Sequence, residues 1–421
     1  MEDICNEFGV LLVPRGTCIE RRVISFLTGH KMQKALDNVI GIEGSLTSQT
    51  LLEDIHNFIL SYPDLSMIHS GEEFEAVLQN LCCDIQIPRV LLQKLTVLKV
   101  QMPDIYQQTL FCSWFGAMIA REMGLPYKKI YNTFLTGLFH DLGLLHVQPD
   151  TLKKTGNFND SEWHSIECHT FISKLIVESV NVFDSDITKG IMQHHERCDG
   201  TGYPNELTKE KLCYTGQIIG LADILYHIRS RQFSILGRNM ADIMPYLQVN
   251  SNTFLFESYQ AVYAIIHRSN LAVTDLLNRK DFPTLPKRLA VQRTKLEKLC
   301  TDLTDFINQI NEISKKRHCK SLIYSSSQIF DIITRSGIGS TEIVKWLEEL
   351  DDSSFDHNHA ELQEIDAMQY ELLWMIKRTC RLIPAILKDE ISLSNDHYED
   401  FKKIAIQIEQ DLHDAWENYE H

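Results

Sequence analysis

Apolar residues recur at spacings of three and four along most of this 421-residue chain. Those between Leu51 and Ile59 fall on one face of a helix that is expected to begin near Ser48 and to end before Pro63. The same periodicity predicts helices joined by short polar loops over residues 101–270. Four more helical segments are expected further along, at residues 287–313, 340–350, 359–382 and 397–418. The pattern predicts a mainly α fold.

The start of the chain has a different pattern. The apolar run from Val10 to Val13 leads into a Pro14-Arg15-Gly16 turn, which predicts a short strand, and residues 19–27 predict a short helix. We therefore divide the chain into three predicted domains. They are a small mixed N-terminal domain (1–98), a helical central domain (99–270) and an acidic helical C-terminal region (271–421).

The charge of the chain argues against one class of partner. Lys and Arg number 41 and Asp and Glu number 57, a net charge of −16, whereas a protein that binds duplex nucleic acid needs a densely cationic surface. Much of the excess lies in residues 342–421, where 20 acidic residues stand against 7 basic ones. Such acidic helical faces are either solvated or form a docking surface for a partner or a second subunit.

Cysteine content and hydropathy bear on the compartment. Eleven cysteines in 421 residues are too dilute for a disulfide scaffold, which favours reduced, mostly buried thiols. The N-terminus carries acidic residues where a signal peptide needs basic ones, and no run of about 18 apolar residues occurs. A cytoplasmic protein without a membrane span is expected.

Histidine and aspartate residues gather between positions 140 and 223. His140-Asp141 follows a predicted helix, His169 follows a capped helix start, and His194-His195 ends another helix. Asp223 stands alone among apolar neighbours, and a buried carboxylate there needs a partner or a metal. Each of these residues alone is compatible with an ordinary structural hydrogen bond, as are the scattered histidines 30, 56 and 69.

Together, the six residues predict a metal centre. Neutral imidazole and carboxylate suit first-row ions such as iron, manganese or zinc. Two such ions about 3.5–4 Å apart, bridged by a carboxylate, form a clamp for in-line attack on phosphorus. The alternative is a set of polar residues that satisfy one another inside a helical core.

The motifs in this stretch resemble the HD-GYP family, a branch of the HD-superfamily metal-dependent phosphohydrolases. His140-Asp141 matches the HD pair, and Lys154 and Gly156 resemble the Lys-Pro-Gly element that precedes His169 by fifteen residues. HHERCDGTGYP, at 194–204, is close to the family's HHE…G.GYP consensus, and LADILY resembles its closing aspartate helix. The resemblance covers about residues 100–270.

The resemblance implies a function and a ligand set. The family hydrolyses cyclic di-GMP, and in some members other cyclic dinucleotides, to pGpG or on to GMP. It implies two divalent transition-metal ions, with iron or manganese expected, and catalytic roles for His140 and Asp141. The first ion would be held by His140, Asp141, Asp223 and an upstream histidine, and the second by Asp141, His169, His194 and His195. The Gly-Tyr-Pro loop implies docking to a diguanylate cyclase domain.

Three positions depart from the family pattern. Gln108 stands where the upstream histidine is expected, Leu144 replaces a phosphate-binding lysine, and Gln232 replaces an arginine. Asp104, one turn before Gln108, is an alternative ligand for the first ion. Nearby residues are expected to contact substrate instead, namely Lys154, Arg197, Tyr203 and Arg231, with Lys153 and Arg229 as further candidates.

The sequence therefore predicts an intact second metal site, a weakened first site and slow hydrolysis of cyclic di-GMP. The alternative hypothesis is a catalytically degenerate HD-GYP domain that binds a metal or nucleotide and acts in cyclic di-GMP signalling through protein contacts. The intact ligands and the near-consensus loop favour the enzyme, whereas Gln108, Leu144 and Gln232 favour the degenerate domain.

Overall fold

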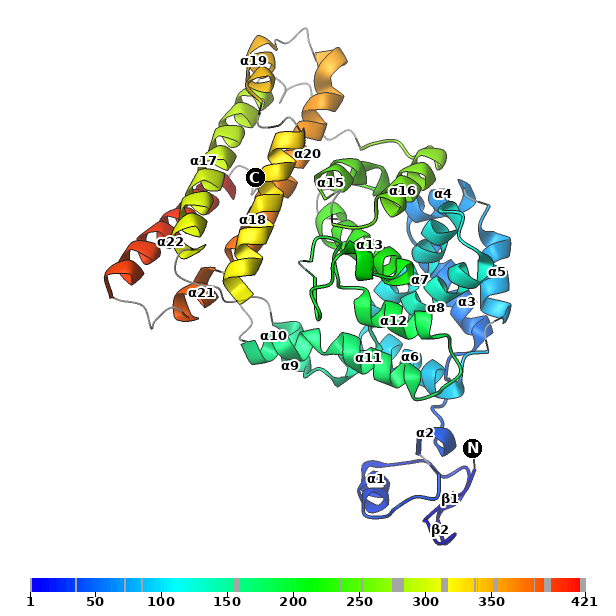
Figure 1. The fold of residues 1–421 in the computed structure, drawn as a ribbon. Coiled ribbons are helices and arrows are strands. Elements are labelled where there is room, and N and C mark those ends of the chain that lie inside the picture. Colours follow the sequence, from blue (N-terminus) through cyan, green and yellow to red (C-terminus); the bar gives the residue numbers. More distant parts are fainter. Residues whose placement is uncertain are drawn as a thin grey trace. The chain divides into compact units, whose positions relative to one another are not determined.

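The chain is mainly helical in the computed structural model, as the periodicity predicted (Figure 1). The described residues are 2–34, 36–71, 73–84, 86–154, 160–200, 202–234, 237–250, 253–274, 284–311, 317–336, 338, 340–350, 355–381, 383–389 and 395–416. They form two compact units. The first contains the described residues of 2–154, 160–195 and 213–226, and the second contains those of 196–212 and 227–416. The predicted boundaries at residues 98 and 270 remain predictions.

A small strand pair opens the first unit. β1 (Ile4–Cys5) and β2 (Leu11–Val13) are antiparallel, and Ile4 lies opposite Val13. The turn between them is held by the Asn6 side chain, whose Oδ1 accepts hydrogen bonds from two backbone N–H groups. α1 (Arg21–Thr28) and α2 (Leu36–Val39) cover the pair and complete a small apolar cluster of Ile4, Val13, Leu27 and Val39. The predicted strand and helix are both confirmed.

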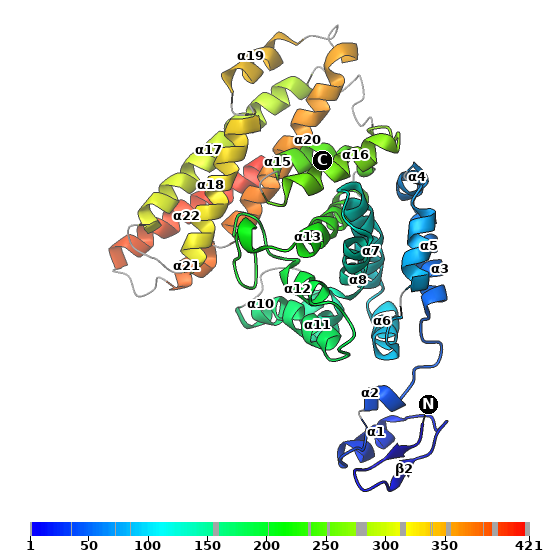
Figure 2. The same cartoon turned by 45° about the vertical axis from the view of Figure 1, so that its right-hand side comes forward.

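Two long helices form the centre of the first unit, α7 (Pro103–Glu122) and α8 (Tyr127–Phe139). They lie side by side in both views of the ribbon (Figures 1 and 2). Gly137 makes this close approach possible, because a Cβ there would overlap the backbone of Cys112 and Ser113 on α7. The helices that precede them along the chain are α3 (Ser48–Leu60), α4 (Pro63–Gly71), α5 (Glu75–Asp84) and α6 (Arg89–Gln101).

Shorter elements follow α8 and complete the first unit. A 3₁₀ turn η1 (Leu142–His146) packs against α11 (His169–Glu178), and Gly143 N–H donates to Ser173 Oγ at 2.7 Å. Gly143 also lies so close to the His169 carbonyl that a side chain would overlap it. The remaining helices are α9 (Pro149–Lys153), α10 (Asp160–Glu167), α12 (Ser185–Gln193) and α13 (Tyr214–His227).

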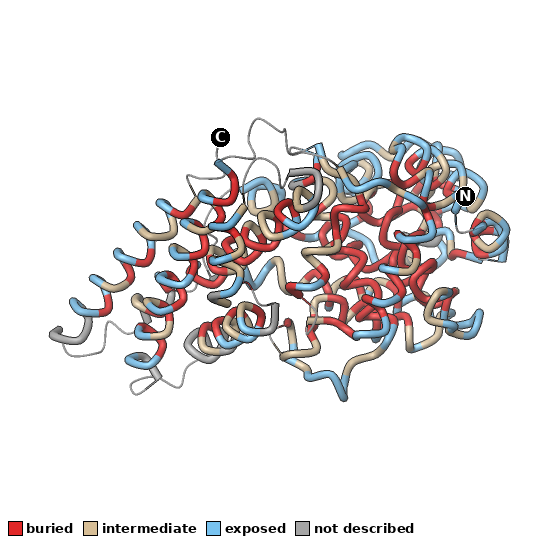
Figure 3. Tube along the Cα trace, turned by 90° about the horizontal axis from the view of Figure 1, so that it is seen from above, coloured by how far each residue is buried: buried red, intermediate tan, exposed pale blue. Residues whose placement is uncertain are grey.

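The second unit is built around a helical bundle. Its main helices are α17 (Leu285–Asn311), α18 (Arg317–Ser336), α19 (Thr341–Glu349), α20 (Phe355–Cys380), α21 (Ile383–Asp389) and α22 (Asn395–Trp416). Buried positions recur along one side of these helices and exposed positions along the other (Figure 3). The four predicted C-terminal helices are confirmed within a few residues at each end. The sequence analysis missed α18 and α21.

The elements before the bundle belong to the same unit. They are the short turn η2 (Lys209–Lys211), a single π-helical turn η3 (Ile228–Phe233), the 3₁₀ turn η4 (Met240–Ile243), α15 (Met244–Val249) and α16 (Phe256–Arg268). Val249, at the end of α15, is buried in the same core as Leu299, Phe306 and Leu372 of the bundle. Among the described helices, none has both the length and the apolar character that a membrane crossing requires.

Candidate metal centre

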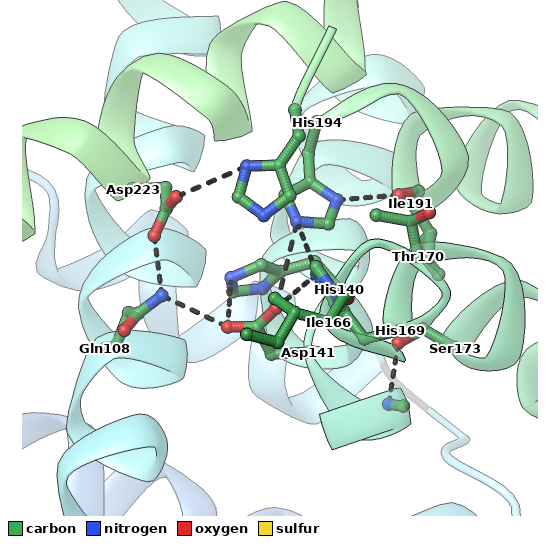
Figure 4. Close-up of polar contacts among 12 residues, drawn as sticks. Gln108, His140, Asp141, Ile166, His169, Thr170, Ser173, Ile191, His194 and Asp223 are labelled. Atoms are coloured by element: carbon green, nitrogen blue, oxygen red, sulfur yellow. Dashed lines mark hydrogen bonds and ion pairs between the residues drawn. The ribbon is translucent and has the colours of Figure 1, made fainter. Parts of the chain in front are cut away.

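Helix ends place the predicted ligands in one buried cluster of the first unit (Figure 4). His140 follows the last residue of α8, and His194 follows the last residue of α12. His169 opens α11, while Asp223 lies inside α13. Of these ligands, His195 is the one that reaches solvent, with 17% of its side chain exposed, whereas His140, Asp141, His169, His194 and Asp223 are at most 4% exposed.

Asp141 is the centre of the cluster. Its Oδ1 lies 3.2 Å from His169 Nε2 and 3.7 Å from His194 Nε2. The two histidine Nε2 atoms are themselves 3.4 Å apart. One ligand atom from each of Asp141, His169, His194 and His195 falls within 4.8 Å of all the others. The residues predicted for the second ion therefore lie together and form a set that fits a divalent transition metal.

A repeated backbone contact orients three of the imidazoles. His140 Nδ1 lies 2.8 Å from the Gly137 carbonyl, His169 Nδ1 2.5 Å from that of Ile166, and His194 Nδ1 2.6 Å from that of Ile191. In each case the histidine donates Nδ1–H to the carbonyl three residues earlier, at the end of a helix where that carbonyl has no intrahelical partner. This contact makes Nε2 the nitrogen that faces the centre, and a neutral ring presents its lone pair there, the arrangement that metal-binding histidines use.

Burial and mutual charge set the protonation of the cluster. Burial lowers the pKa of His194, and the charges of His140 and His169 lower it further, so it lies well below its usual range. Burial would raise the pKa of Asp141, but the charges and hydrogen bonds of His140 and His169 together outweigh burial and hold the pKa well below normal. Burial would likewise lower the pKa of His140, yet the Asp141 carboxylate raises it well above normal. An ionised Asp141 and a neutral His194 are the forms that bind metal.

Gln108 occupies the predicted first site. Its side-chain nitrogen donates hydrogen bonds to Asp223 Oδ1 at 2.6 Å and to Asp141 Oδ2 at 3.1 Å (Figure 4). The amide thus bridges the two carboxylates that the resemblance assigned to the first ion. Asp104, the alternative ligand, is exposed in the first turn of α7, and no metal-type cluster among the described residues includes it.

The structure adds a residue that the sequence analysis missed. Cys112 is fully buried on α7, and its sulfur lies with His140 and Asp223 in a second group whose ligand atoms are all within 4.8 Å of one another. Burial raises the pKa of its thiol to about 12. The sequence feature that could have revealed Cys112 is its position one helical turn after Gln108, which puts both residues on the same face of α7.

The predicted substrate contacts are divided between the two units. Lys154 is exposed and pairs with Glu162 at 2.7 Å. In the second unit, the Arg197 guanidinium donates to the Glu196 carbonyl and lies 4.6 Å from the Phe254 ring centroid. Tyr203 is half-buried and Arg231 is exposed. Leu144 is buried, as an apolar residue should be, while Gly156 and the Gln232 side chain lie outside the described residues.

The Gly-Tyr-Pro loop is held by the glutamate of the HHE motif. Buried Glu196 accepts hydrogen bonds from the backbone N–H groups of Asn205 at 2.7 Å and Leu207 at 2.9 Å. Gly202 packs directly on the Glu196 backbone, so that any Cβ at this position would overlap it. Glu196 and Gly202, the glycine of Gly-Tyr-Pro, therefore fix the shape of this loop, a structural role of Glu196 that the sequence motif did not reveal.

Two of the scattered histidines share one carboxylate. Glu75 Oε2 lies 2.9 Å from His56 Nε2 and 3.0 Å from His69 Nε2, while Trp114 Nε1–H donates to His69 Nδ1 at 3.1 Å. Because His69 Nδ1 accepts the hydrogen bond from Trp114, the ring hydrogen of His69 is on Nε2, which donates to Glu75. A metal at His69 Nε2 would need the opposite tautomer. The structural expectation for these two histidines is therefore supported.

Comparison with known proteins agrees with this geometry. Residues 92–257 match the family model described as HD domain. This part of the chain, with its His140-Asp141 pair at the centre of a helical histidine cluster, matches an HD domain, and the resemblance to the HD-GYP type is confirmed.

The relatives are named as cyclic-dinucleotide enzymes. A 3'3'-cGAMP-specific phosphodiesterase of Vibrio cholerae is 36% identical over 106 residues, which are 25% of this chain and 24% of the relative. Cyclic di-GMP phosphodiesterases of Pseudomonas aeruginosa and Thermotoga maritima are each 28% identical, over 124 and 130 residues. These two matches cover 30% and 31% of this chain and 30% and 35% of the relatives, so the chain spans about a quarter to a third of the length of each relative.

Proposed function

We propose that this chain is a metal-dependent phosphodiesterase that hydrolyses cyclic di-GMP to pGpG, and further cleavage of pGpG to GMP is the second step to assay. The carrying observation is the buried Asp141 carboxylate, which faces the Nε2 atoms of His169 and His194 at 3.2 and 3.7 Å. The names of the relatives support a cyclic dinucleotide as the substrate class.

The ligand set supports iron or manganese as the resident ions. Three imidazoles and a carboxylate, from His169, His194, His195 and Asp141, would hold the tighter ion, and His140 and Asp223 would contribute to a weaker one. When bound, such ions supply an activated water and neutralise charge on the phosphoryl oxygens. His140 and Asp141 are the proposed catalytic residues because they belong to this centre.

The chain's own residues prepare the site for an anionic substrate. Asp141 is held ionised by its contacts with His140 and His169 together, and the backbone carbonyls of Gly137, Ile166 and Ile191 fix the imidazole rings before any ligand arrives. His195 provides the solvent-facing edge at which a phosphodiester would meet the centre. Lys154, Arg197, Tyr203 and Arg231 remain the proposed substrate contacts.

Two substitutions support slow turnover. Gln108 contributes an amide where an imidazole would bind the first ion, and Leu144 removes a cation that would contact phosphate. A charge-assisted hydrogen bond is worth about 1.5–3 kcal/mol, so the loss of one such contact costs roughly tenfold or more in rate or affinity.

Partners and compartment stay part of the proposal. The Gly-Tyr-Pro loop, shaped by Glu196, is the proposed docking element for a diguanylate cyclase domain. The acidic helices of the C-terminal region are the proposed surface for a second copy of the chain, and the cytoplasm is the proposed location. No duplex nucleic acid is expected as a partner because the net charge is −16.

The test is hydrolysis by the full-length chain, purified without oxygen and loaded with Mn²⁺ or Fe²⁺. Cyclic di-GMP and 3'3'-cGAMP are supplied separately and the products are resolved by chromatography. We expect slow formation of pGpG that Asp141→Ala abolishes, while Asp150→Ala, which changes an exposed aspartate of α9, leaves the rate unchanged. A wild type that is inactive with every metal contradicts the proposal.

One observation favours a second candidate, a degenerate HD-GYP domain that binds nucleotide and acts through protein contacts. The Gln108 amide already satisfies both carboxylates of the first site, so this pair is stable without an ion. Under this alternative, calorimetry would detect cyclic di-GMP binding with no product formed. The same result would persist when Gln108 is replaced by histidine.

A further inference from the structure

A buried thiol lies at the edge of the metal centre, where the proposed function does not use it. Cys112 is fully buried, and its sulfur groups with His140 and Asp223. His140 Nε2 is also fully buried and has no hydrogen-bond partner among the described atoms. Asp141 Oδ2 lies 3.3 Å from it, but without hydrogen-bond geometry. A buried nitrogen without a hydrogen-bond partner calls for an explanation. Together with the neighbouring thiol and carboxylate it offers three ligand atoms to a metal ion.

The fold holds this group rigidly. The backbone next to Cys112 packs on Gly137, and the Gly137 carbonyl is the group that fixes His140 Nδ1. The contact of Gly137 with α7 therefore holds both Cys112, through its backbone, and His140, through the Gly137 carbonyl. Asp223 comes from α13, and Gln108 fixes its Oδ1 by a 2.6 Å hydrogen bond. All three side chains thus have defined positions before any ion binds.

We propose that Cys112, His140 and Asp223 form a thiolate-containing metal site that takes a borderline-soft ion of the zinc class. This proposal deepens the proposed function, since it renames the ligands of the weaker ion: the thiolate takes the place of the absent histidine. Three protein ligands of S, N and O type leave a fourth position open, as in catalytic zinc sites.

The dimensions and donor types fit this assignment. Zinc binds sulfur at about 2.3 Å and nitrogen or oxygen at about 2.0–2.2 Å, which separates tetrahedral ligand atoms by about 3.3–3.8 Å. The three atoms here lie within 4.8 Å of one another, so small side-chain movements complete the geometry. A coordinated thiol loses its proton to solvent, and thiolate selects zinc over the harder ions manganese and magnesium. The two sites would then prefer different metals.

The alternative is a thiol that merely fills space in the core. Burial of cysteine is common and by itself indicates no ligand. Cys82 provides the comparison inside the same unit, because it is also buried but does not belong to any of the metal-type groups of the described residues. If Cys112 belongs to a metal site, its sulfur should bind a metal ion, whereas the sulfur of Cys82 should not.

The experiment uses cobalt and zinc with the full-length chain. Stripped protein is titrated with Co²⁺, and the near-ultraviolet sulfur-to-cobalt charge-transfer band is recorded. We expect a band in the wild type that Cys112→Ser and Cys112→Ala both lose and that Cys82→Ser retains. The zinc content should fall from two ions per chain to one in the Cys112 variants. Loss of a residue that merely supports a metal ligand typically weakens metal binding about 10–100-fold, so loss of the ligand Cys112 itself should weaken zinc binding at this site by at least that much.

A second measurement needs no variant. X-ray absorption at the zinc edge of the wild type should show a sulfur neighbour at about 2.3 Å. Cobalt that binds without the charge-transfer band, or zinc that shows nitrogen and oxygen neighbours alone, overturns the thiolate site while leaving the histidine centre intact. A sulfur signal in a protein that hydrolyses no cyclic dinucleotide supports the site and contradicts the proposed activity instead. Protein that binds neither metal overturns both.

Discussion

The side-chain amide of Gln108 donates a 2.6 Å hydrogen bond to Asp223, a residue 115 positions further along the chain. The same nitrogen donates to Asp141 at 3.1 Å. One neutral NH₂ group therefore holds together two buried carboxylates that would otherwise repel each other, in the place where a family histidine would bring a metal ion. We therefore expect the identity of residue 108 to decide whether the proposed first site is closed by an amide or open to an ion.

Replacing Gln108 by histidine should open that site. The variant gives up the amide bridge and supplies an imidazole nitrogen to a metal, so the second equivalent of Mn²⁺ should bind more tightly. Combined with Leu144→Lys, which adds a phosphate contact, the variant should hydrolyse cyclic di-GMP at least about tenfold faster, the effect of roughly 1.4 kcal/mol. Gln108→Ala is the control, since it removes the bridge without adding a ligand. An equal gain in the alanine variant would show that relief of the bridge, not a new ligand, is responsible.

Loss of one imidazole should empty the tighter site. His169→Ala and His194→Ala each remove a nitrogen that lies within 3.7 Å of Asp141 Oδ1, so dialysed protein should lose its retained metal ion. His146→Ala, which alters an exposed histidine of η1, should keep it. Metal analysis after dialysis measures the result. Full metal content in both centre variants would refute the ligand assignment.

The same variants should lose the stabilising effect of metal. An ion that binds only the folded chain adds about 2.7 kcal/mol at a concentration 100 times its dissociation constant. Wild-type thermal denaturation should therefore shift upward with added Mn²⁺, whereas His169→Ala should show little shift.

Much of this centre could be predicted from the sequence, and the reasons differ between residues. The spacing of His140, Asp141 and His194 at helix ends is a local pattern, so motif and periodicity were enough. Cys112 was missed because its proposed role depends on the contact of Gly137 with α7, a tertiary contact that no local pattern encodes. Helix α18 was missed because its Ser325-Ser326-Ser327 stretch weakens the helical signal, and packing in the bundle overrides that local preference.

A methyl group at Gly143 should damage the metal site indirectly. Its Cβ would overlap the His169 carbonyl and crowd the Ser173 N–H, so Gly143→Ala must push η1 and α11 apart. We expect lower thermal stability and weaker metal retention, because His169 moves away from Asp141. Gly29→Ala is the matched control, since a Cβ there meets the Phe26 carbonyl oxygen at 3.4 Å. Unchanged metal binding in Gly143→Ala would show that the contact can relax without moving the ligand.

Asp186 should give the first unit a measurable pH dependence. It lies in the first turn of α12 and is 16% exposed, and it accepts from Lys129 at 2.9 Å, Thr215 at 2.9 Å and Asn132 at 3.3 Å. Burial would raise its pKa, but these partners outweigh burial and lower it below the ordinary 3.8. The stabilisation is therefore fully present above pH 3.8 and is lost as pH falls through the depressed pKa.

The variant Asp186→Asn tests the direction of this pH dependence of stability. At pH 7 the variant should unfold with about 1.5–3 kcal/mol less free energy than the wild type, the range for a hydrogen bond to a charged group. The difference should shrink as the pH is lowered below 3.8, since the wild-type carboxylate then takes up a proton. Urea denaturation at several pH values measures it. A difference that stays constant down to low pH would mean that shape, not charge, accounts for the loss.

Truncation after residue 270 should expose the core of the second unit. Val249 is 1% exposed in a core with Leu299, Phe306 and Leu372, which such a truncation removes. It also removes Thr274, whose backbone N–H and hydroxyl both bond to Asp242 at 3.0 and 2.7 Å. An exposed apolar patch of this kind promotes association, so we expect the fragment 1–270 to aggregate or to bind a hydrophobic dye. Light scattering and size-exclusion chromatography measure this outcome. A monomeric, cooperatively folding fragment would instead show that residues 271–421 are an independent module and that α15 needs no bundle to fold.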